Sequence, residues 1–558
     1  MSDRSKSSHF LVQGSILAVA SILVRVIGLI YRIPMQRIIG QEGTGLYSYS
    51  FEVYNIALIL SSYSLPLAVS RLVAVRRVNK EHRNSYRIFL CAMALAIGVG
   101  SVATLVIFFG ADFLATSLFK SPNTALPLRV LSPTIFIFSI MGVLRGFYQG
   151  KNTTIPTALS QVLEQLVNAV VSILAAYLFV KNFSASVNVA AWGASGGTLG
   201  TFAGACIALI FLLFVFALYK PVINKQVRHD HSDHLESYGS IFKLLIITIL
   251  PIILSQTVYQ ISGLLDGTLF GHIMSSKIIT TFDNEVLKVL PSQLYTDSNR
   301  DTLWGIYSGE YRLLTNVPVA VATAMGAAIV TSISADMARG MEAAIKSKVH
   351  SAIKFNMIIA IPSAVGMSVL AAPIISLIFD DQYHLSANIM MLGSISIVFY
   401  ALSTISTAIL QGINKLRIPV IHSAISLGIH IILVFGLLQF THLSTYALVI
   451  GNVTFPLVVS ILNWLSIEKY LKYQQEVIKT FVIPFVSAGL MGIVAFFTYY
   501  GMDKLTGSNL LSTVLAVFIA IIVYFLLLVF LRGLSEEELA FVPKGTVIVR
   551  VMKKMHLL

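Results

Sequence analysis

One stretch near the start of the chain decides the fold: residues 11–52, LVQGSILAVASILVRVIGLIYRIPMQRIIGQEGTGLYSYSFE. It opens with an apolar run over 11–39, and a membrane-spanning helix needs only about 20 apolar residues. The run is too long for the core of a signal peptide and has no clear small-residue cleavage site, so we interpret it as a retained first helix. A break rich in glycine and a second apolar run follow. Two consecutive transmembrane helices are therefore predicted here.

Composition extends this prediction to the whole chain. Of 558 residues, 56% are hydrophobic and 11% are charged, and the mean hydropathy is +0.82. A soluble protein carries about 25% charged residues, so this chain has too few to cover a large water-facing surface. Long apolar runs in lipid must satisfy their own backbone as helices, which predicts an all-α polytopic membrane protein. Fourteen spans are expected: 11–39, 45–70, 87–110, 126–149, 156–180, 190–219, 241–271, 304–334, 351–378, 387–411, 418–439, 443–467, 479–500 and 509–532.

Lysine and arginine indicate the orientation of these spans. With the N-terminus placed in the cytoplasm, 28 of the 39 basic residues fall on the cytoplasmic side and seven on the opposite side. Such a bias is the positive-inside pattern of membrane proteins. It predicts that both termini are cytoplasmic, and it accounts for most of the net charge of +14 without a nucleic-acid partner.

A weak internal repeat divides the chain. The sequence QGKN followed by IP, at 149–156, recurs as QGIN followed by IP at 411–419, and GLYS at 45–48 recurs as GIYS at 305–308. The offsets are 262 and 260 residues. The QGxN segments themselves are interpreted as helix-ending turns. Their spacing predicts two parallel copies of a six-helix unit, an arrangement that suits alternating access around a central cavity.

The repeat predicts a domain organisation and leaves two segments without an assigned role. The long connection between the halves contains the cluster His229–His234, which we interpret as polar linker because no helical spacing supports a metal site. The outward loop 272–303 has no readable motif. The predicted domains are an N-lobe at 11–219, a cytoplasmic linker at 220–240, a C-lobe at 241–467, two additional helices within 479–532 that are a possible groove for a lipid tail, and a cytoplasmic tail at 533–558.

Charged residues inside the spans are the first candidates for a functional site, because a charge there costs roughly 2.5–3.5 kcal/mol by insertion scales and usually faces a cavity. Arg25 and Arg32 are seven residues apart on the first span, which places them on one face about 10 Å apart along the axis. Glu52 in the second span, and Glu310 and Arg312 in the eighth, lie at a depth similar to that of Arg32. Arginine binds phosphate through two parallel hydrogen bonds. The alternative is that these charges only neutralise one another.

Other polar residues in the spans have no role that the sequence decides. Glu164 on the fifth span, with Gln256 and Asp266 on the seventh, could line the cavity, bind a coupling ion or stabilise a helix interface. Neither a phosphate loop, a nucleophile elbow nor an HExxH helix occurs. The sequence therefore predicts no enzyme, no metal and no cofactor, and sodium, protons and membrane potential remain open as sources of energy.

Five motifs carry a resemblance to a known family: RVIG at 25–28, IIGQEGTGLY at 38–47, LPLAVSR at 65–71, RGFYQG at 145–150, and the segment from Arg312-Leu313 up to Pro318. With these motifs the chain resembles the polysaccharide-transporter branch of the multidrug/oligosaccharidyl-lipid/polysaccharide (MOP) exporter superfamily. The chain is most similar within it to the stage V sporulation protein B and MurJ-type lipid II flippases of Gram-positive bacteria, and the likeness covers nearly the whole chain.

The resemblance implies two six-helix lobes in a V with a cavity for a lipid-linked sugar head group. Arginines on helices 1, 2 and 8 of MurJ-type flippases line that cavity and are thought to meet the diphosphate. Arg25 and Arg312 match two of these positions, and Arg32 lies one residue away from another. The arginine of helix 2 has no counterpart, and Glu52 is the charge available there. In the family, helices 13 and 14 form a groove for the polyprenyl tail.

The expected function is therefore export-direction flipping of an undecaprenyl-diphosphate-linked saccharide, most of all lipid II, in the bacterial cell membrane. A single chain contains both lobes and is expected to function as a monomer among membrane lipids. Three alternatives stay open: a flippase for a capsule, exopolysaccharide or teichoic-type unit, a drug/ion antiporter, and a membrane polysaccharide polymerase. An antiporter would need an acidic cation site, and a polymerase would need clustered catalytic side chains in a large outward loop.

Overall fold

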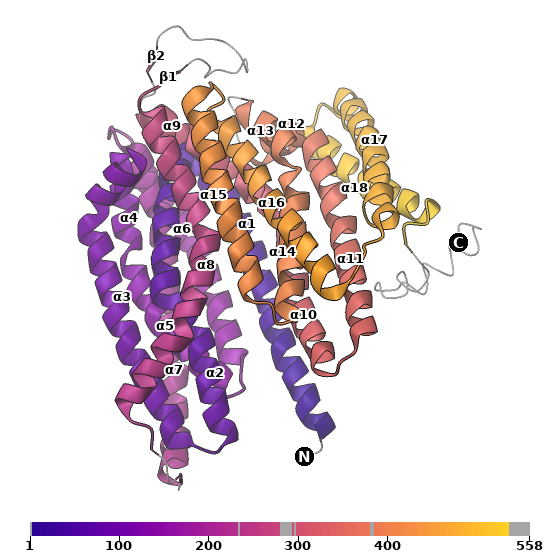
Figure 1. The fold of residues 1–558 in the computed structure, drawn as a ribbon. Coiled ribbons are helices and arrows are strands. Elements are labelled where there is room, and N and C mark those ends of the chain that lie inside the picture. The colour runs from indigo at the N-terminus through magenta and orange to yellow at the C-terminus, as the bar shows by residue number, and fades with distance from the viewer. Residues whose placement is uncertain are drawn as a thin grey trace. The chain divides into compact units, whose positions relative to one another are not determined.

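A computed structural model describes residues 3–230, 232, 235–279, 293–294, 297–379 and 384–534, and these residues are almost entirely helical (Figure 1). The predicted all-α membrane class is confirmed. Most of the predicted tail 533–558, residues 280–292 and 295–296 of the outward loop, and His231, Asp233 and His234 of the linker cluster lie outside the described residues.

Among the described residues, 12 helices are long and apolar enough to cross a membrane, or 13 if one bent pair counts as a span. One of the 12 runs over Leu23–Val78, which at 56 residues is far longer than one crossing needs. Helix α1 (Asp3–Leu58), which contains the first part of this span, breaks at Gly40, where φ is 69° and ψ is 179°. Residues with a Cβ rarely adopt this φ. The break falls between the first two predicted spans, and fourteen spans remain a prediction.

The chain forms two compact units. The first comprises Met1–Ile278 and Leu294–Gly309, and the second comprises Ile279–Gln293 and Glu310–Leu558. These ranges differ from the predicted lobes, because helix α8, which the sequence assigned to the C-lobe, is packed within the first unit. Figure 1 labels the α-helices of the first unit. In chain order the helices of this unit are α1, η1 (Ile59–Tyr63), α2 (Ser64–Val78), α3 (His82–Phe119), η2 (Pro122–Thr124), α4 (Ala125–Leu131), α5 (Pro133–Gly150), α6 (Ile155–Asn182), α7 (Val189–Arg228), α8 (Tyr238–Met274) and α9 (Asp297–Gly305).

Small residues bring α6 and α7 into close contact in the first unit. A Cβ at Gly196 would lie 2.6 Å from the Ala176 Cα, and one at Gly200 would overlap the Ser172 hydroxyl. Glycines four residues apart form a smooth stripe on one helix face, which is how helices approach closely in lipid. The Ser172 hydroxyl donates to the Gly197 carbonyl at 2.8 Å and fixes the pair.

The second unit contains the two additional C-terminal helices. Tyr524 of α18 donates to the Ile358 carbonyl of α11 at 2.9 Å, and Asn509 donates to the Ser376 hydroxyl of α12 at 2.9 Å. This pair is therefore packed on α11 and α12. The helices are η3 (Ile306–Tyr311, divided between the units), α10 (Arg312–Ala338), α11 (Glu342–Val369), α12 (Ala371–Ile378), α13 (Leu385–Gly393), α14 (Ser396–Gly412), α15 (Arg417–Phe440), α16 (Thr445–Leu471), η4 (Ile478–Val482), α17 (Ile483–Thr506) and α18 (Asn509–Phe530), and two short strands pair at β1 (Ile278–Ile279) and β2 (Gln293–Leu294).

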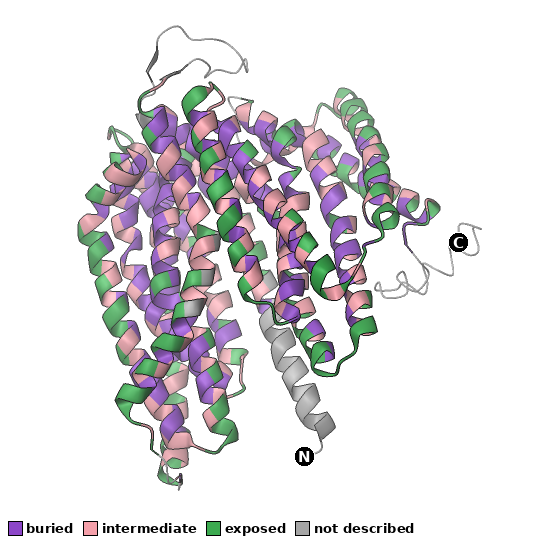
Figure 2. Cartoon of the chain, viewed as in Figure 1, coloured by how far each residue is buried: buried purple, intermediate pink, exposed green. Residues whose placement is uncertain are grey.

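Figure 2 shows that exposed residues, in green, are frequent along the helices, and many of the exposed residues are large and apolar. Phe109 and Phe113 on α3 are examples, with 75% and 71% of their surface accessible. A soluble protein rarely exposes such continuous apolar surface. Lipid is the solvent that suits it, in agreement with a multi-pass membrane protein.

Candidate functional site

The two arginines of the first span lie on α1, before its break. Arg25 is exposed, whereas Arg32 is half-buried with its guanidinium beside the phenols of Tyr31 and Tyr47. Tyr31 precedes Gly40 and Tyr47 follows it, so the break in α1 brings both rings to the same cation. Within the described part of the chain, the buried Arg32 Nε has no hydrogen-bond acceptor. A buried donor left without a partner costs about 1–3 kcal/mol, which favours a site that a ligand or water completes.

Two carboxylates of the first unit belong to α1 and α8. The Glu52 carboxylate lies against Gly263, where a Cβ would be 2.7 Å from the carboxyl carbon. Asp266 follows less than one helical turn later and is 4% exposed. Gln256 lies further back on α8 and is half-buried. Because Gly263 has no side chain, the Glu52 carboxylate of α1 can pack directly against the α8 backbone.

Glu164 is held by an ion pair that sequence reasoning missed. Arg145 of α5 donates from its Nη2 to a Glu164 carboxylate oxygen at 2.8 Å and from its Nε to the Ser160 hydroxyl at 3.0 Å. Both side chains are largely buried. A signal was present, because Arg145 lies six residues before Lys151 and Ser160 lies six residues after Thr154. An antiparallel helical hairpin with its turn between them places them side by side.

Glu310 and Arg312 belong to the second unit. Glu310 is buried and Arg312 is half-buried, and both lie where the π-helical turn η3 passes into α10. Tyr311 between them is tied to three groups of this unit: its hydroxyl bonds the Gly393 carbonyl at 3.0 Å, the Ser396 hydroxyl at 3.1 Å and the Asn452 side chain at 3.0 Å. π-Helical turns occur frequently at functional sites.

Two histidines in the apolar helix α15 were also missed. His422 bonds the Asn463 side chain at 2.7 Å, and His430 bonds the Gly451 carbonyl at 3.0 Å. Asn463 in turn donates to the hydroxyls of Ser406 and Thr407. Hydrogen bonds of this kind join helices in lipid. A single histidine in an apolar run gives no sequence signal for its partner on another helix.

The predicted site residues are thus divided between the units. Arg25, Arg32 and Glu52 belong to the first unit, and Glu310 and Arg312 belong to the second. The ring of charges at one depth stays a prediction. Of the residues that the structure describes, no three or more His, Cys, Asp or Glu side chains form a group suited to a metal ion.

Long lipid-compatible helices define the class as multi-pass helical membrane proteins. Within that class the chain belongs to the polysaccharide biosynthesis protein family, whose family model matches residues 11–335. A second family model, MatE, matches residues 313–435.

This chain is similar to two curated relatives over most of their length. The chain is 24% identical to the lipid II flippase MurJ of Bacillus subtilis (strain 168), over 87% of this chain and 88% of the relative. It is 23% identical to stage V sporulation protein B of the same organism, over 97% and 99%. These relatives are a flippase and a sporulation protein rather than enzymes, in agreement with the expectation that this chain is not an enzyme.

Solved structures support the fold. A lipid II flippase MurJ in an inward closed conformation matches with a TM-score of 0.63 at 14% identity, over 92% of this chain and 97% of that chain. A MATE family multidrug resistance transporter of the MOP superfamily, in an inward-facing conformation, matches with a TM-score of 0.63 at 15% identity, over 82% and 98%. The resemblance to the MOP superfamily is confirmed.

Proposed function

We propose that this protein is a flippase that carries an undecaprenyl-diphosphate-linked saccharide from the inner to the outer leaflet of the bacterial cell membrane, and that lipid II is its first candidate substrate. Membership of the polysaccharide biosynthesis family and similarity to MurJ support a lipid-linked saccharide as the cargo. Lipid II is the finer part of the proposal, and it depends on the arginines. Transport by alternating access suits a chain with two units.

Arg32 is the residue whose environment carries the proposal. Its guanidinium is half-buried in an apolar helix, and its Nε lacks an acceptor in the described structure. A diphosphate offers several oxygen acceptors to a planar guanidinium, which can donate two parallel hydrogen bonds. Arg25 on the same helix and Arg312 in the second unit are the other proposed diphosphate ligands. Glu310 is placed beside Arg312 in the chain and is proposed to orient it.

The carboxylates of the first unit are proposed to couple transport to an ion. Glu52 contacts α8 at Gly263, and the buried Asp266 lies on the same helix. A carboxylate in lipid is costly when charged, so binding a sodium ion or a proton there would be favourable. Glu164 is a weaker candidate because Arg145 already neutralises it.

Complementation tests the proposal. A bacterium is depleted of its essential lipid II flippase, this protein is supplied, and labelled lipid II is followed on the outer leaflet. Restored flipping that is lost with Arg25→Ala, but kept with Arg37→Ala, supports both the substrate and the site. Arg37 is a matched control because it is an exposed arginine on the same helix.

Failure of a well-expressed, correctly inserted protein would contradict lipid II as substrate. Transport assays in proteoliposomes then separate the alternatives. Movement of a capsule, exopolysaccharide or teichoic-type lipid-linked unit would keep the class of cargo, whereas exchange of a cationic drug for an ion would replace it.

A further inference from the structure

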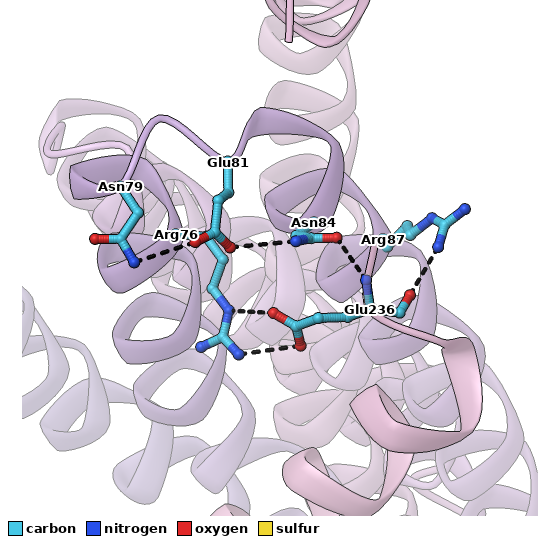
Figure 3. Close-up of polar contacts among 6 residues, drawn as sticks. All are labelled: Arg76, Asn79, Glu81, Asn84, Arg87 and Glu236. Atoms are coloured by element: carbon cyan, nitrogen blue, oxygen red, sulfur yellow. Dashed lines mark hydrogen bonds and ion pairs between the residues drawn. The ribbon is translucent and has the colours of Figure 1, made fainter. Parts of the chain in front are cut away.

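The connection between α7 and α8 is fixed to the first unit by Glu236 (Figure 3). Its carboxylate accepts two hydrogen bonds from the Arg76 guanidinium, at 2.9 and 3.0 Å. Its backbone N–H donates to the Asn84 side chain at 3.0 Å, and its carbonyl accepts from Arg87 at 2.7 Å. Three separate groups of one residue are therefore bound by α2 and α3. A planar bidentate pair of this kind also fixes direction.

Asp230 holds the other end of the same connection. Its carboxylate accepts from the Arg83 backbone N–H at 2.6 Å and from the Ser232 N–H at 2.8 Å. Arg83 is in the first turn of α3, so Asp230 acts as a cap for that helix end. Desolvation tends to raise the pKa of Asp230, but these hydrogen bonds together outweigh it and lower the pKa below its ordinary value. The carboxylate is therefore ionised at neutral pH.

The helix that follows, α8, is packed in the first unit at both ends. Near its start, the Arg87 guanidinium lies 5.0 Å from the centre of the Tyr238 ring, and Ile241 and Leu245 are fully buried in the apolar core shared with α3. Near its end, a Cβ at Gly271 would overlap the Phe119 carbonyl oxygen of α3. Contacts at both ends make α8 an integral helix of the first unit.

The short helix α9 is bound to the same unit. The Trp304 and Tyr49 rings stack with their centres 4.8 Å apart. A Cβ at Gly45 would overlap the Asp301 carbonyl, and one at Gly305 would overlap the Gln41 carbonyl. The glycines that revealed the sequence repeat therefore permit backbone contact between α1 and α9, which no larger residue would allow.

Within the π-helical turn η3, the partners of the chain change. Up to Gly309, whose carbonyl accepts from Gln36 at 3.0 Å, the chain is bound to the first unit. At Tyr311, the side-chain hydroxyl bonds groups of the second unit. π-Helical turns are rare, are frequent at functional sites and are a recognised place for helices to kink.

We infer that Asp230 and Glu236 together form a permanent latch and that the chain bends at Ile306–Tyr311 during transport, so that α8 and α9 move with the first unit. The inference deepens the proposed function and rests on it, because it assigns the moving parts of that transport cycle. The long linker between the sequence repeats is then not the hinge.

Two chemical cross-links test the inference in the full chain. Both are introduced into a variant in which Cys91→Ser and Cys206→Ala remove the native cysteines. Arg76→Cys with Glu236→Cys is linked by a short bismaleimide across the latch, and Ser308→Cys with Leu313→Cys is linked across the π-helical turn. We expect the first pair to transport poorly until linking restores it. We expect the second pair to transport until linking stops it. Failure of linking to restore transport in the latch pair, or full transport after linking the turn, would overturn the inference.

A readout that needs no substrate separates this inference from the proposed function. Hydrogen exchange of the full chain in lipid nanodiscs should show slow exchange at the Ser232 and Glu236 amides, and faster exchange in Arg76→Ala. The control is Lys479→Ala, which removes the exposed pair with Glu476 and should leave these amides slow. If the unmodified chain moves no lipid-linked saccharide, the proposed function fails, and fast exchange at the two amides would overturn the latch itself.

Discussion

Arg32 combines burial, two neighbouring phenols and a donor that lacks an acceptor among the described residues. Arg32→Ala should therefore lower the initial transport rate roughly tenfold or more, since a hydrogen bond to a charged group is worth about 1.5–3 kcal/mol. The initial rate of Arg32→Lys should lie between those of the unmodified chain and of Arg32→Ala, because lysine keeps the charge and loses the planar fork. Initial rates in proteoliposomes measure both. An Ala variant as active as Arg37→Ala would remove Arg32 from the site.

The Arg145–Glu164 pair governs stability in our account, not ligand binding. Glu164→Leu should lower the free energy of unfolding by about 3–5 kcal/mol, because a buried cation is left without its partner. Arg145→Leu combined with Glu164→Leu should be much milder, since both charges are then gone. Thermal unfolding in detergent compares the variants. Equal losses in the single and double variants would show that packing, and not charge, determines the effect.

At the residue scale, the sequence indicated which charged side chains lie within the spans, but it did not indicate which residues each of them contacts. Arg32 and Glu164 were both singled out as charges within spans. The structure places Arg32 beside two tyrosines and Glu164 on Arg145, and only the second contact is foreseeable from a hairpin. Tyr47 reaches Arg32 because of the particular angle at Gly40, which spacing along a helix does not contain.

Close contact between α6 and α7 makes a prediction at the scale of elements. Gly200→Ala should destabilise the protein by about 1–3 kcal/mol, because its Cβ would overlap the Ser172 hydroxyl. Gly98→Ala is the matched control in α3, where no atom lies within 4 Å of an added Cβ. It should be neutral or stabilising by about 0.5–1 kcal/mol, since alanine favours helix. Unfolding in detergent measures both, and similar losses would contradict the close approach.

Breaks in helices were predicted where glycine marks them and missed where tertiary packing makes them. The glycines after residue 39 predicted the break that the structure shows at Gly40. The span predicted at 387–411 is instead a bent pair, α13 and α14, with an angle of 45° between them. Ser394 and Ser396 at the bend look ordinary in sequence, but Ser396 bonds Tyr311 from a distant helix.

At the scale of the whole molecule, composition and the bias of basic residues were enough to predict the membrane-protein class. Solvation by lipid depends on the total amounts of apolar and charged residues, which the sequence states directly. The unit boundary did not follow from them. The repeat placed it near residue 240, whereas the chain passes for the last time from the first unit to the second between Gly309 and Glu310. That difference arises from contacts such as Arg76–Glu236, which join residues 160 positions apart. No local pattern encodes them.

Topology provides the last prediction. In the same Cys91→Ser and Cys206→Ala background, Val187→Cys and Lys504→Cys should react with a membrane-impermeant maleimide on intact cells. Lys80→Cys and Asn414→Cys should react only after permeabilisation. All four positions are exposed, and the positive-inside bias places the first two outside.

The position of Asn414 relative to Val187 carries the most information. Between these residues lie four described candidate spans and the bent pair α13–α14. If the bent pair crosses the membrane, five crossings separate the two residues and they face opposite sides, as a fourteen-span chain with both termini in the cytoplasm requires. If the pair re-enters on the same side, four crossings separate them, and Asn414→Cys would be labelled from outside together with Val187→Cys. That result would contradict both the span count and the predicted orientation of the C-terminus, whereas protection of Asn414→Cys would support them together.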